Sequence, residues 1–334
     1  MSDQDQDKTE KPVKLVHYTT AEAAYSILSK GELWMRKASL MNDFKEASFF
    51  IDIMHKLQRH QKEFLHSNKT PKEYKERYKE EIEKDETIQE CLKRRGETYG
   101  ENTLQEILSE NEMAISELRH KTYISSFSIE SDEEKTFLGR LSMWRSYGSK
   151  ASIAIVFTGA FYTKLIKVKQ SIENFTIACD KVFYPVISVN PKNLLQLSLE
   201  TILLHNMVLR MGASACFFVK HRGFQEEVEW RLLIQEIDGE NLELDQNYTL
   251  TDNLTLRKSL RIIRDIPQEI FILNFNPQED IDYVIVGPTF DIDHAYAIRD
   301  CFQKLTYNKD NKDNYVFSDS HKIHLSEIPL RMYG

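Results

Sequence analysis

The chain has 334 residues, of which 41% are hydrophobic and 29% are charged, and this balance excludes wholesale disorder. Lysine and arginine number 44 against 52 acidic residues, so the net charge of −8 excludes a general electrostatic nucleic-acid binder but leaves a local basic patch open. The first 12 residues are polar and acidic and are interpreted as a disordered leader rather than a signal peptide. No apolar run is long enough to span a bilayer, so no membrane partner is expected.

The N-terminal segment predicts a strand, a helix and a second strand. Residues 14–18 read as a short strand, Thr20 and its neighbour Thr19 can cap a helix, and Gly31 can end it. Residues 32–36 then have strand character, and Asn42-Asp43 marks a turn.

The next segment is rich in charge. Residues from about 45 to 120 are dense in lysine and glutamate, which is typical of two or three solvent-facing helices with intermittent apolar stripes. We interpret about 47–120 as a helical insert in a single domain that spans residues 13–334. Such an insert is more often a solvated cover than a binding surface.

Strand signals dominate the rest of the chain. Strands are predicted at 122–128, 151–157, 180–185, 228–234 and 283–288, and helices at 141–148, 194–211 and 294–305. Because the strands are not regularly interleaved with helices, the pattern favours an α+β fold over a doubly wound parallel sheet.

The four cysteines, Cys91, Cys179, Cys216 and Cys301, show no CxxC spacing. This spacing predicts neither a disulfide framework nor a zinc site, and it favours a reducing cytoplasm.

The first candidate site surrounds the strand predicted from Val228. Alternate side chains of a strand share a face, so Glu227, Glu229 and Arg231 should project together while the residues between them face the core. Two carboxylates on one face repel each other unless a cation or a polar ligand engages them. The alternative is a solvated strand surface.

The second candidate site is His17-Tyr18-Thr19, where the first strand meets the helix. Strand ends of this kind often line ligand sites. The alternatives are a hydrogen-bonded structural histidine and a core tyrosine.

The third candidate site combines hydroxyl and aromatic side chains. Ser126 and Ser128 lie on a predicted strand, where they can bond a ribose or their own backbone. Trp144 and Tyr147 lie three residues apart on a predicted helix and so share a face. Core packing is the favoured interpretation for Trp144.

Several common catalytic motifs are absent from the sequence. It contains no GxGxxG loop, no Walker GKS or GKT, no HExxH and no GxSxG elbow. His321 and His324 lie three residues apart, but no acidic or cysteine partner is spaced to complete a metal site. No metal is therefore expected.

The ordered set of motifs resembles a bacterial family, domain-of-unknown-function family 2971, over about residues 14–305. The motifs that carry the resemblance are, in chain order, His17-Tyr18-Thr19, Leu33-Trp34, Asn42-Asp43-Phe44-x-Glu46, Ser126-Phe127-Ser128, Met143-Trp144-x-x-Tyr147, Val182-x-Tyr184, Lys220, Phe224-x-x-Glu227-x-Glu229-Trp230-Arg231 and Ile281-x-x-Val284-Ile285-x-Gly287-Pro288. The chain departs from the family in its longer charged insert and in Lys45, which stands near the place of a family proline.

This arrangement resembles, in turn, the ADP-ribosyltransferase superfamily of the His-Tyr-Glu kind. The resemblance implies a split β-sheet core with flanking helices and NAD as a co-substrate. It also implies that His17 bonds the NAD ribose. Glu227 or Glu229 would hold the ribose 2′-OH and stabilise an oxocarbenium-like transition state.

The resemblance assigns further residues to NAD. Tyr147 is the first choice for stacking on nicotinamide, with Trp144 and Tyr18 behind it. Arg231 would orient the carboxylates or a phosphate. The full set implied to contact NAD is His17, Tyr18, Thr19, Ser126, Ser128, Trp144, Tyr147 and Arg231, with Arg36, Lys37 and Arg145 as further cations.

The leading hypothesis is therefore an NAD-dependent ADP-ribosyltransferase-like enzyme that modifies a macromolecule, either RNA, DNA or protein. A toxin or a phage-defence effector is the setting that the resemblance implies. Two alternatives stay open: a non-catalytic binding or sensor module that uses the charged insert, and a nuclease that uses the carboxylates with a divalent metal.

Overall fold

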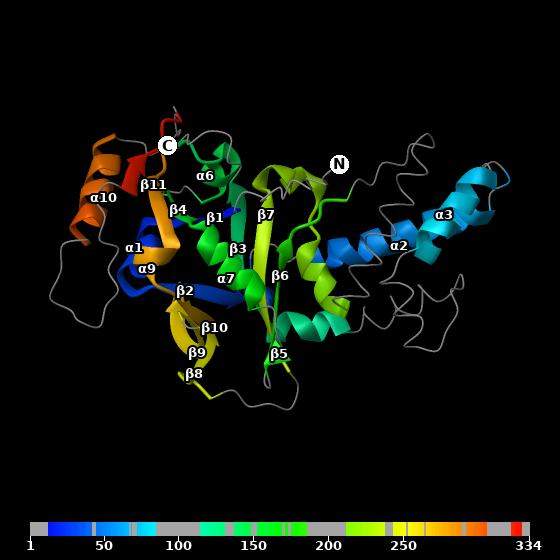
Figure 1. Ribbon diagram of the computed structural model, residues 1–334, viewed down its shortest axis with the longest axis horizontal. Coiled ribbons are helices and arrows are strands. Elements are labelled where there is room, and N and C mark those ends of the chain that lie inside the picture. The colour runs from blue at the N-terminus through cyan, green and yellow to red at the C-terminus, as the bar shows by residue number, and fades with distance from the viewer. Residues whose placement is uncertain are drawn as a thin grey trace, which may run out of the picture. The chain divides into compact units, whose positions relative to one another are not determined.

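A computed structural model describes residues 13–41, 45–66, 68, 72–84, 114–130, 137–147, 152–168, 171–172, 175–185, 212–237, 243–251, 253–263, 265–288, 292–305 and 322–328 (Figure 1). These residues form a mixed α+β structure around a large, mostly antiparallel sheet of 12 strands. The predicted α+β class is therefore confirmed.

The elements of the described residues have the following bounds. The strands are β1 (Lys14–Thr20), β2 (Glu32–Lys37), β3 (Thr122–Glu130), β4 (Ser152–Phe157), β5 (Ser171–Ile172), β6 (Phe175–Lys181), β7 (Glu229–Glu236), β8 (Asn247–Thr251), β9 (Leu254–Ile263), β10 (Ile266–Asn274), β11 (Ile281–Val286) and β12 (Ile323–Leu325). The helices are α1 (Ala21–Lys30), α2 (Lys45–His66), α3 (Lys72–Lys84), α6 (Leu141–Tyr147), α7 (Gly159–Lys167), α9 (Pro277–Asp280) and α10 (Ile292–Leu305), with one more over 114–121. Short 3-10 helices are η1 (Ala38–Leu40), η3 (Gly212–Phe218) and η4 (Arg222–Glu227).

The chain divides into two compact units. Unit 1 comprises residues 1–36, 123–179 and 227–334, and unit 2 comprises 37–122 and 180–226. The insert predicted at about 47–120 falls within unit 2, which also takes a second excursion that the sequence analysis did not assign to it.

The strand β3 is the branch point of the sheet. It has three neighbours, β1, β2 and β7, although a strand has only two edges. The β1–β3 pairs run only from Lys14↔Glu130 to Val16↔Ser128, so β1 occupies one end of its edge. The sheet therefore splits at β3 into a branch through β1, β4, β11 and β12, a branch through β2, β10, β9 and β8, and a side branch through β7, β6 and β5.

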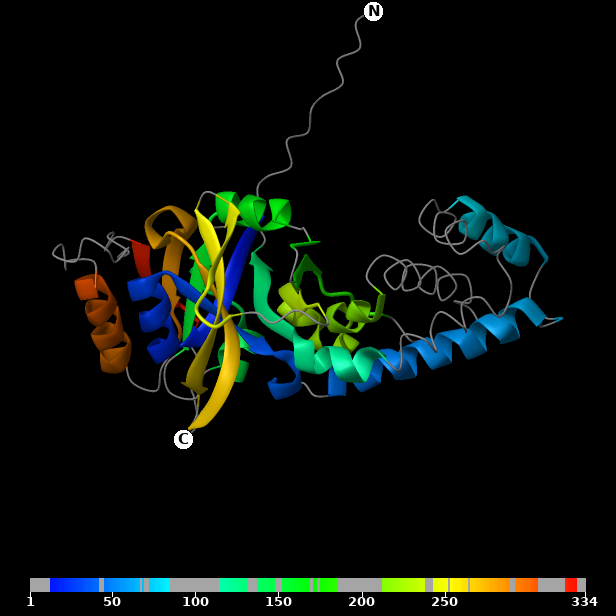
Figure 2. The same ribbon diagram turned by 90° about the horizontal axis from the view of Figure 1, so that it is seen from below.

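Strand alternation sorts the core of unit 1 into two apolar clusters. Leu15 belongs to the larger cluster, which includes buried side chains of α1, α7 and α10. Val16 and Tyr18 belong to a smaller cluster that is closed by Met143 and Trp144 of α6. Helix α10 lies beside α1 in both ribbon views (Figures 1 and 2).

Local signals fix the ends of α1 as predicted. The Thr20 side-chain oxygen accepts a hydrogen bond from the Ala23 N–H at 3.3 Å, which caps the first turn. Gly31 has a left-handed φ of 66° and donates its N–H to the Ile27 carbonyl, which closes the last turn.

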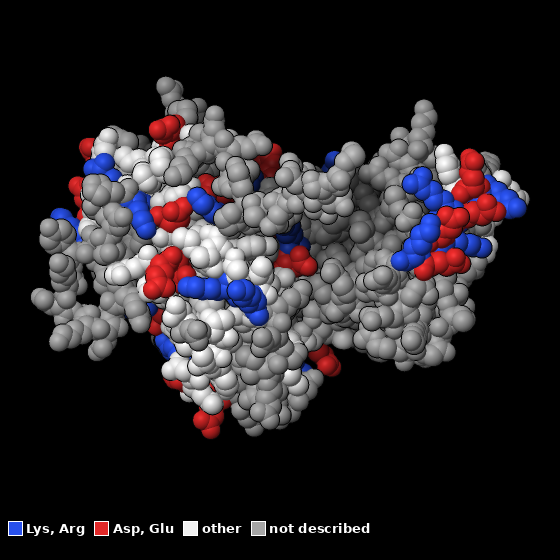
Figure 3. All heavy atoms as spheres, in the orientation of Figure 1, with Lys and Arg blue, Asp and Glu red and all other residues white. Residues whose placement is uncertain are grey.

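Unit 2 contains the charged helices. The predicted helical character of the insert is confirmed by α2, α3 and the helix over 114–121. Lysine and glutamate alternate over the surface of α3 (Figure 3), with exposed ion pairs Lys72–Glu76 at 3.6 Å and Lys84–Glu80 at 3.4 Å. None of the helices in the described ranges is both long and apolar enough to cross a membrane.

One predicted strand differs in its bounds, and several further strands were not predicted. The strand predicted at 180–185 lies earlier, as β6, because alternate residues of 175–179 are buried; Phe183 keeps only an isolated bridge to Val219. The hairpin β9–β10 and the strand β8 were not predicted at all. The leader 1–12, the Asn42-Asp43 turn and the helix predicted at 194–211 lie outside the described residues.

Candidate functional site

His17 lies on β1, one residue beyond the last pair with β3, where the two strands separate. Its Nδ1 is 3.0 Å from the Ser126 carbonyl oxygen, and its ring centroid is 5.7 Å from that of Phe127. Burial lowers the pKa of His17, against the effect of the hydrogen bond to Ser126. The imidazole is therefore neutral at pH 7. Because a carbonyl can only accept, Nδ1 carries the proton and Nε2 is an acceptor.

β3 carries hydroxyls that lack partners. Among the described residues, the buried side-chain oxygens of Ser125, Ser126 and Ser128 form no hydrogen bond, and neither do those of Thr122 and Ser152. An unsatisfied buried hydroxyl costs about 1–3 kcal/mol, so a group of them calls for an explanation such as a bound ligand. Ser126 and Ser128 share one face of β3.

Glu229 and Arg231 form a buried, bidentate ion pair on β7. The guanidinium Nε donates to Glu229 Oε1 at 2.7 Å and Nη2 donates to Oε2 at 3.0 Å. Both residues are buried, at 6% and 1% exposure. Their positions two apart on a strand make them face the same way, as predicted. The guanidinium holds the carboxylate in a single orientation.

The hydroxyls and the ion pair lie on one face of the β3–β7 ribbon. The Ile129 N–H donates to the Val228 carbonyl at 3.0 Å, and the Phe127 and Trp230 rings lie 5.8 Å apart. These contacts run in opposite directions along the strands, so β3 and β7 are antiparallel. Since Phe127 and Trp230 share the face toward the larger core cluster, the two serines and the ion pair share the other face.

The structure separates Glu227 from this arrangement. Glu227 is the last residue of η4, and strand alternation begins only at Glu229. Between them, Val228 has a φ of 43° and is exposed, so it does not face the core. The prediction that Glu227 shares a strand face with Glu229 is therefore wrong. The cause is a left-handed β-branched residue, a conformation that sequence alternation does not reveal.

Two of the three aromatic candidates are packed in the smaller core cluster. The Tyr18 and Trp144 rings meet edge to face at 4.9 Å, and Trp144 is fully buried with Nε1–H donating to the Leu138 carbonyl at 2.8 Å. The Tyr18 hydroxyl accepts the Arg140 N–H at 2.7 Å, and burial raises the pKa of Tyr18 to about 12. These contacts give both rings a structural role. The side chain of Tyr147 lies outside the described residues.

The remaining candidates that the structure describes include Thr19 on β1, Arg36 on β2 and Arg145 on α6. Thr19 is partly exposed and shares a strand face with His17, while Arg145 is exposed on α6. Arg36 donates from Nη2 to Gln268 Oε1 at 3.3 Å. In the described ranges, no three His, Cys, Asp or Glu side chains gather closely enough to hold a metal ion.

Sequence reasoning missed Arg140, which fastens the segment before α6 to the sheet. Its Nη2 donates to the Ile129 carbonyl at 2.6 Å, on the strand that also carries the unpaired serines. No periodic pattern surrounds Arg140, so no sequence signal could have singled it out.

A second missed group is a charged cluster around Lys258. Its ammonium lies 2.7 Å from Glu236 and 3.4 Å from Glu269, and the Tyr123 hydroxyl donates to Glu269 at 3.3 Å. Burial acts to lower the pKa of Lys258, but the bond to Glu236 raises it overall, so the lysine stays charged. Burial raises the pKa of Tyr123, and the two carboxylates add to the shift. The cluster ties together strands that are far apart in sequence.

No family model matches the chain, and neither the curated proteins nor the solved structures contain a match. The resemblance drawn from the motifs therefore stays a prediction.

Proposed function

We propose that the protein is an NAD-dependent ADP-ribosyltransferase-like enzyme with an active site built around β3. The observation that carries the proposal is the placement of His17 and Glu229. Glu229 lies on β7, on the face of the β3–β7 ribbon that also carries the unpaired Ser126 and Ser128. His17 lies on β1 and shares the face of Leu15 and Phe127, and its ring reaches the Ser126 carbonyl at the edge of β3 where β1 separates from it. A split sheet is also what the resemblance to the superfamily implies, so the split at β3 supports the proposal.

The residues suit a ribose. The His17 Nε2 can accept a ribose hydroxyl proton, because Nδ1 is already engaged with the Ser126 carbonyl. The unpaired hydroxyls of Ser126 and Ser128 can bond the hydroxyl and carboxamide groups of NAD. These orphan oxygens are the feature of the site that best fits a polar, uncharged ligand group.

The reaction breaks the bond between ribose C1′ and the nicotinamide nitrogen, which leaves with the bonding electron pair. A nucleophile of the acceptor then bonds to C1′ and loses its proton. Glu229 would stabilise the positive charge that builds on the ribose, and Arg231 would hold the carboxylate in place without reorganisation. Glu227, which ends η4 outside the strand, would serve the acceptor rather than NAD.

The acceptor would be a macromolecule, either RNA, DNA or protein, and the enzyme would act in the bacterial cytoplasm as a toxin or a phage-defence effector. This setting rests on the motif resemblance to family 2971.

The test is label transfer from radiolabelled NAD to a bacterial lysate that is separated into protein, RNA and DNA fractions. The wild type is compared with Glu229→Gln and Glu227→Gln. Glu76→Gln is the matched control, because Glu76 pairs with a lysine on the exposed surface of α3. We expect Glu229→Gln to lose about 100-fold or more of the transfer rate and Glu76→Gln to keep it.

Folding is measured on the same samples, since Glu229→Gln removes the carboxylate that binds the buried guanidinium of Arg231. A cost of about 3 kcal/mol is expected for Glu229→Gln and less than about 0.5 kcal/mol for Glu76→Gln. Transfer is therefore assayed well below the melting temperature of the weaker variant. A wild type that neither labels any fraction nor releases nicotinamide would contradict the proposal and favour a binding module. Nucleic-acid cleavage that a chelator abolishes would instead favour the nuclease.

A further inference from the structure

The strand β9 extends beyond its outer partner. The β8–β9 pairs reach Asn247↔Arg257 and stop there. Residues 259–263 of β9 still pair with β10 on the inner side, and no other described strand pairs with their outer edge. The β9–β10 hairpin is the pair of long yellow strands in Figure 2.

The open edge exposes backbone groups of two apolar residues. The Asp245 N–H donates to the Lys258 carbonyl at 2.7 Å, which shows that Lys258 directs its backbone groups outward. Backbone groups alternate along a strand, so Leu260 and Ile262 direct theirs to the same edge.

The side chains along this edge are apolar on one face. Leu260 is 52% exposed and Ile262 is 73% exposed, and the two share a face of β9. An exposed apolar strand with an open edge is a template for pairing with another chain, and proteins normally protect such an edge.

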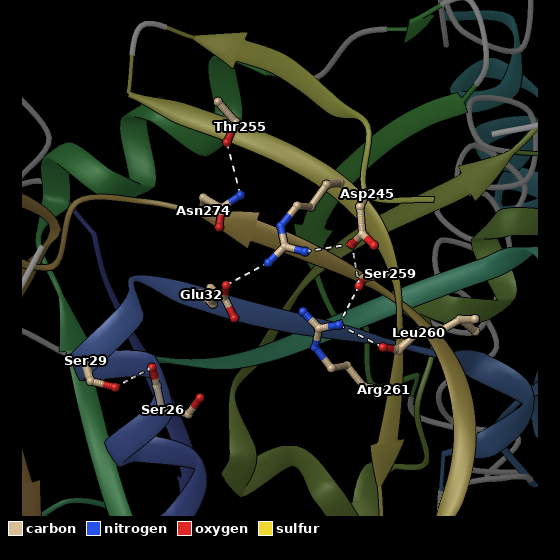
Figure 4. Close-up of polar contacts among 10 residues, drawn as sticks. Ser26, Ser29, Glu32, Asp245, Thr255, Ser259, Leu260, Arg261 and Asn274 are labelled. Atoms are coloured by element: carbon tan, nitrogen blue, oxygen red, sulfur yellow. Dashed lines mark hydrogen bonds and ion pairs between the residues drawn. The ribbon is translucent and has the colours of Figure 1, made fainter. Parts of the chain in front are cut away.

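The other face of the same edge carries a cation. Arg261 donates from Nη1 to Ser259 Oγ at 2.7 Å and to the Leu260 carbonyl at 2.8 Å (Figure 4). Among the described residues it forms no ion pair with a carboxylate. The neighbouring carboxylate of Asp245 is hydrogen-bonded by Arg257 and Ser259. The Ser259 hydrogen bond lowers the pKa of Asp245, and the charges of Arg257 and Arg261 add to that shift.

We propose that the outer edge of residues 259–263 is a docking site for an extended protein segment in which apolar and acidic residues alternate. The segment would add a strand to β9 by backbone hydrogen bonds. Its apolar side chains would cover Leu260 and Ile262, and an acidic side chain would meet Arg261. When the acidic side chain binds the Arg261 guanidinium, the guanidinium releases the Leu260 carbonyl. That carbonyl can then accept a hydrogen bond from an N–H of the added strand.

This partner is chosen by charge complementarity. A second copy of the chain would bring another Arg261 rather than an acid to the edge, and like charges opposite each other on paired strands are destabilising. The inference does not depend on NAD, so it stands or falls separately from the proposed activity.

The probe is a fluorescein-labelled peptide of alternating valine and glutamate, with an alternating valine–lysine peptide as its control. Binding to the full chain is measured by fluorescence polarisation, and backbone protection by hydrogen–deuterium exchange.

We expect the glutamate peptide to protect the amides of Leu260 and Ile262. Arg261→Glu should weaken it by about tenfold and make the lysine peptide the tighter ligand. Lys72→Glu makes the same change of charge on an exposed part of α3 and should leave the order of the peptides unchanged.

Three outcomes would overturn the proposal: no protection at Leu260 and Ile262, an unchanged order of the two peptides in Arg261→Glu, or self-association that protects this edge without peptide. Ile262→Thr keeps a β-branched residue at a site that is mostly exposed, so it should fold normally and weaken both peptides. If Ile262→Thr bound each peptide as tightly as the wild type does, this result would likewise count against the proposal.

Discussion

At the scale of single residues, the partly buried His17 should make folding sensitive to pH. Its pKa in the folded protein is lowered from the ordinary 6.5, so the unfolded chain binds a proton first as the pH falls. The free energy of unfolding should therefore decrease from about pH 7.5 to pH 5.5. His17→Gln should reduce that decrease, as measured by urea unfolding at both pH values. His324, whose pKa burial also lowers, adds a change of the same sign that the variant retains. An unaltered decrease in His17→Gln would show that His17 titrates alike in both states.

Glycine is required where the Trp144 indole is enclosed. A Cβ at Gly139 would lie 2.4 Å from Trp144 Cζ2, and the φ of 69° is left-handed; a Cβ at Gly287 would lie 2.7 Å from Trp144 Cε3. Gly139→Ala should lower the free energy of unfolding by about 2 kcal/mol or more, as judged from urea denaturation. Gly223→Ala is the control, because its φ is not left-handed and its nearest neighbour is the side chain of His221 at 3.1 Å. Equal effects would contradict this account.

Individual residues were predictable where one local pattern decides them. Strand alternation placed Glu229 and Arg231 on one face, and core packing was the favoured interpretation of Trp144. Alternation failed for Glu227, because Val228 has a positive φ, which a β-branched residue rarely adopts and which the local sequence therefore does not reveal. Nor could alternation show that Glu229 and Arg231 neutralise each other.

At the scale of elements, helix α7 depends on a cap. The Thr158 Oγ1 accepts the Phe161 N–H at 3.2 Å, and α7 buries Phe161 and Leu165 in the larger core cluster. Thr158→Ala should cost about 1 kcal/mol in the free energy of unfolding, measured by thermal or urea denaturation. Thr158→Ser keeps the capping oxygen and should restore most of the loss. If serine and alanine were equally destabilising, the methyl group rather than the cap would be responsible.

The elements near the N-terminus were predictable because their signals are local, such as the Thr20 cap and the Gly31 stop. The strand β9 was not, because its charges interrupt the apolar alternation. Arg257 is paired with Glu32 at 2.7 Å and with Asp245 at 3.0 Å, and Lys258 with Glu236. These partners lie on other strands or in a turn. The sequence shows these charges but not the contacts with distant residues that make them compatible with a sheet. The three neighbours of β3 could not be predicted either, because they too are distant from β3 in the sequence.

At the scale of the whole molecule, folding of unit 2 should depend on a folded unit 1 more than folding of unit 1 depends on unit 2. Both segments of unit 2 leave unit 1 and return to it. A folded unit 1 fixes their ends and lowers the entropic cost of closing them, whereas an unfolded unit 1 does not. Trp34, Trp144 and Trp230 all belong to unit 1, so tryptophan emission reports on that unit alone.

Phe50→Ala, a buried residue of α2 in unit 2, should lower the urea midpoint of the helical circular dichroism signal and leave that of tryptophan emission unchanged. Phe127→Ala, a buried residue of β3 in unit 1, should lower both midpoints. The prediction fails if Phe50→Ala shifts the two signals equally, because the units would then unfold together.

The two excursions of the chain into unit 2 have a consequence for how the protein can change during evolution. One leaves at the end of β2 and returns at the start of β3, and the other leaves at the end of β6 and returns just before β7. Each leaves and rejoins unit 1 within two residues of a strand end. Lineages can therefore lengthen, shorten or exchange these excursions without disturbing the hydrogen bonds of the sheet. The strands that bear His17 and Glu229 can then keep their pairing while the excursions change in length.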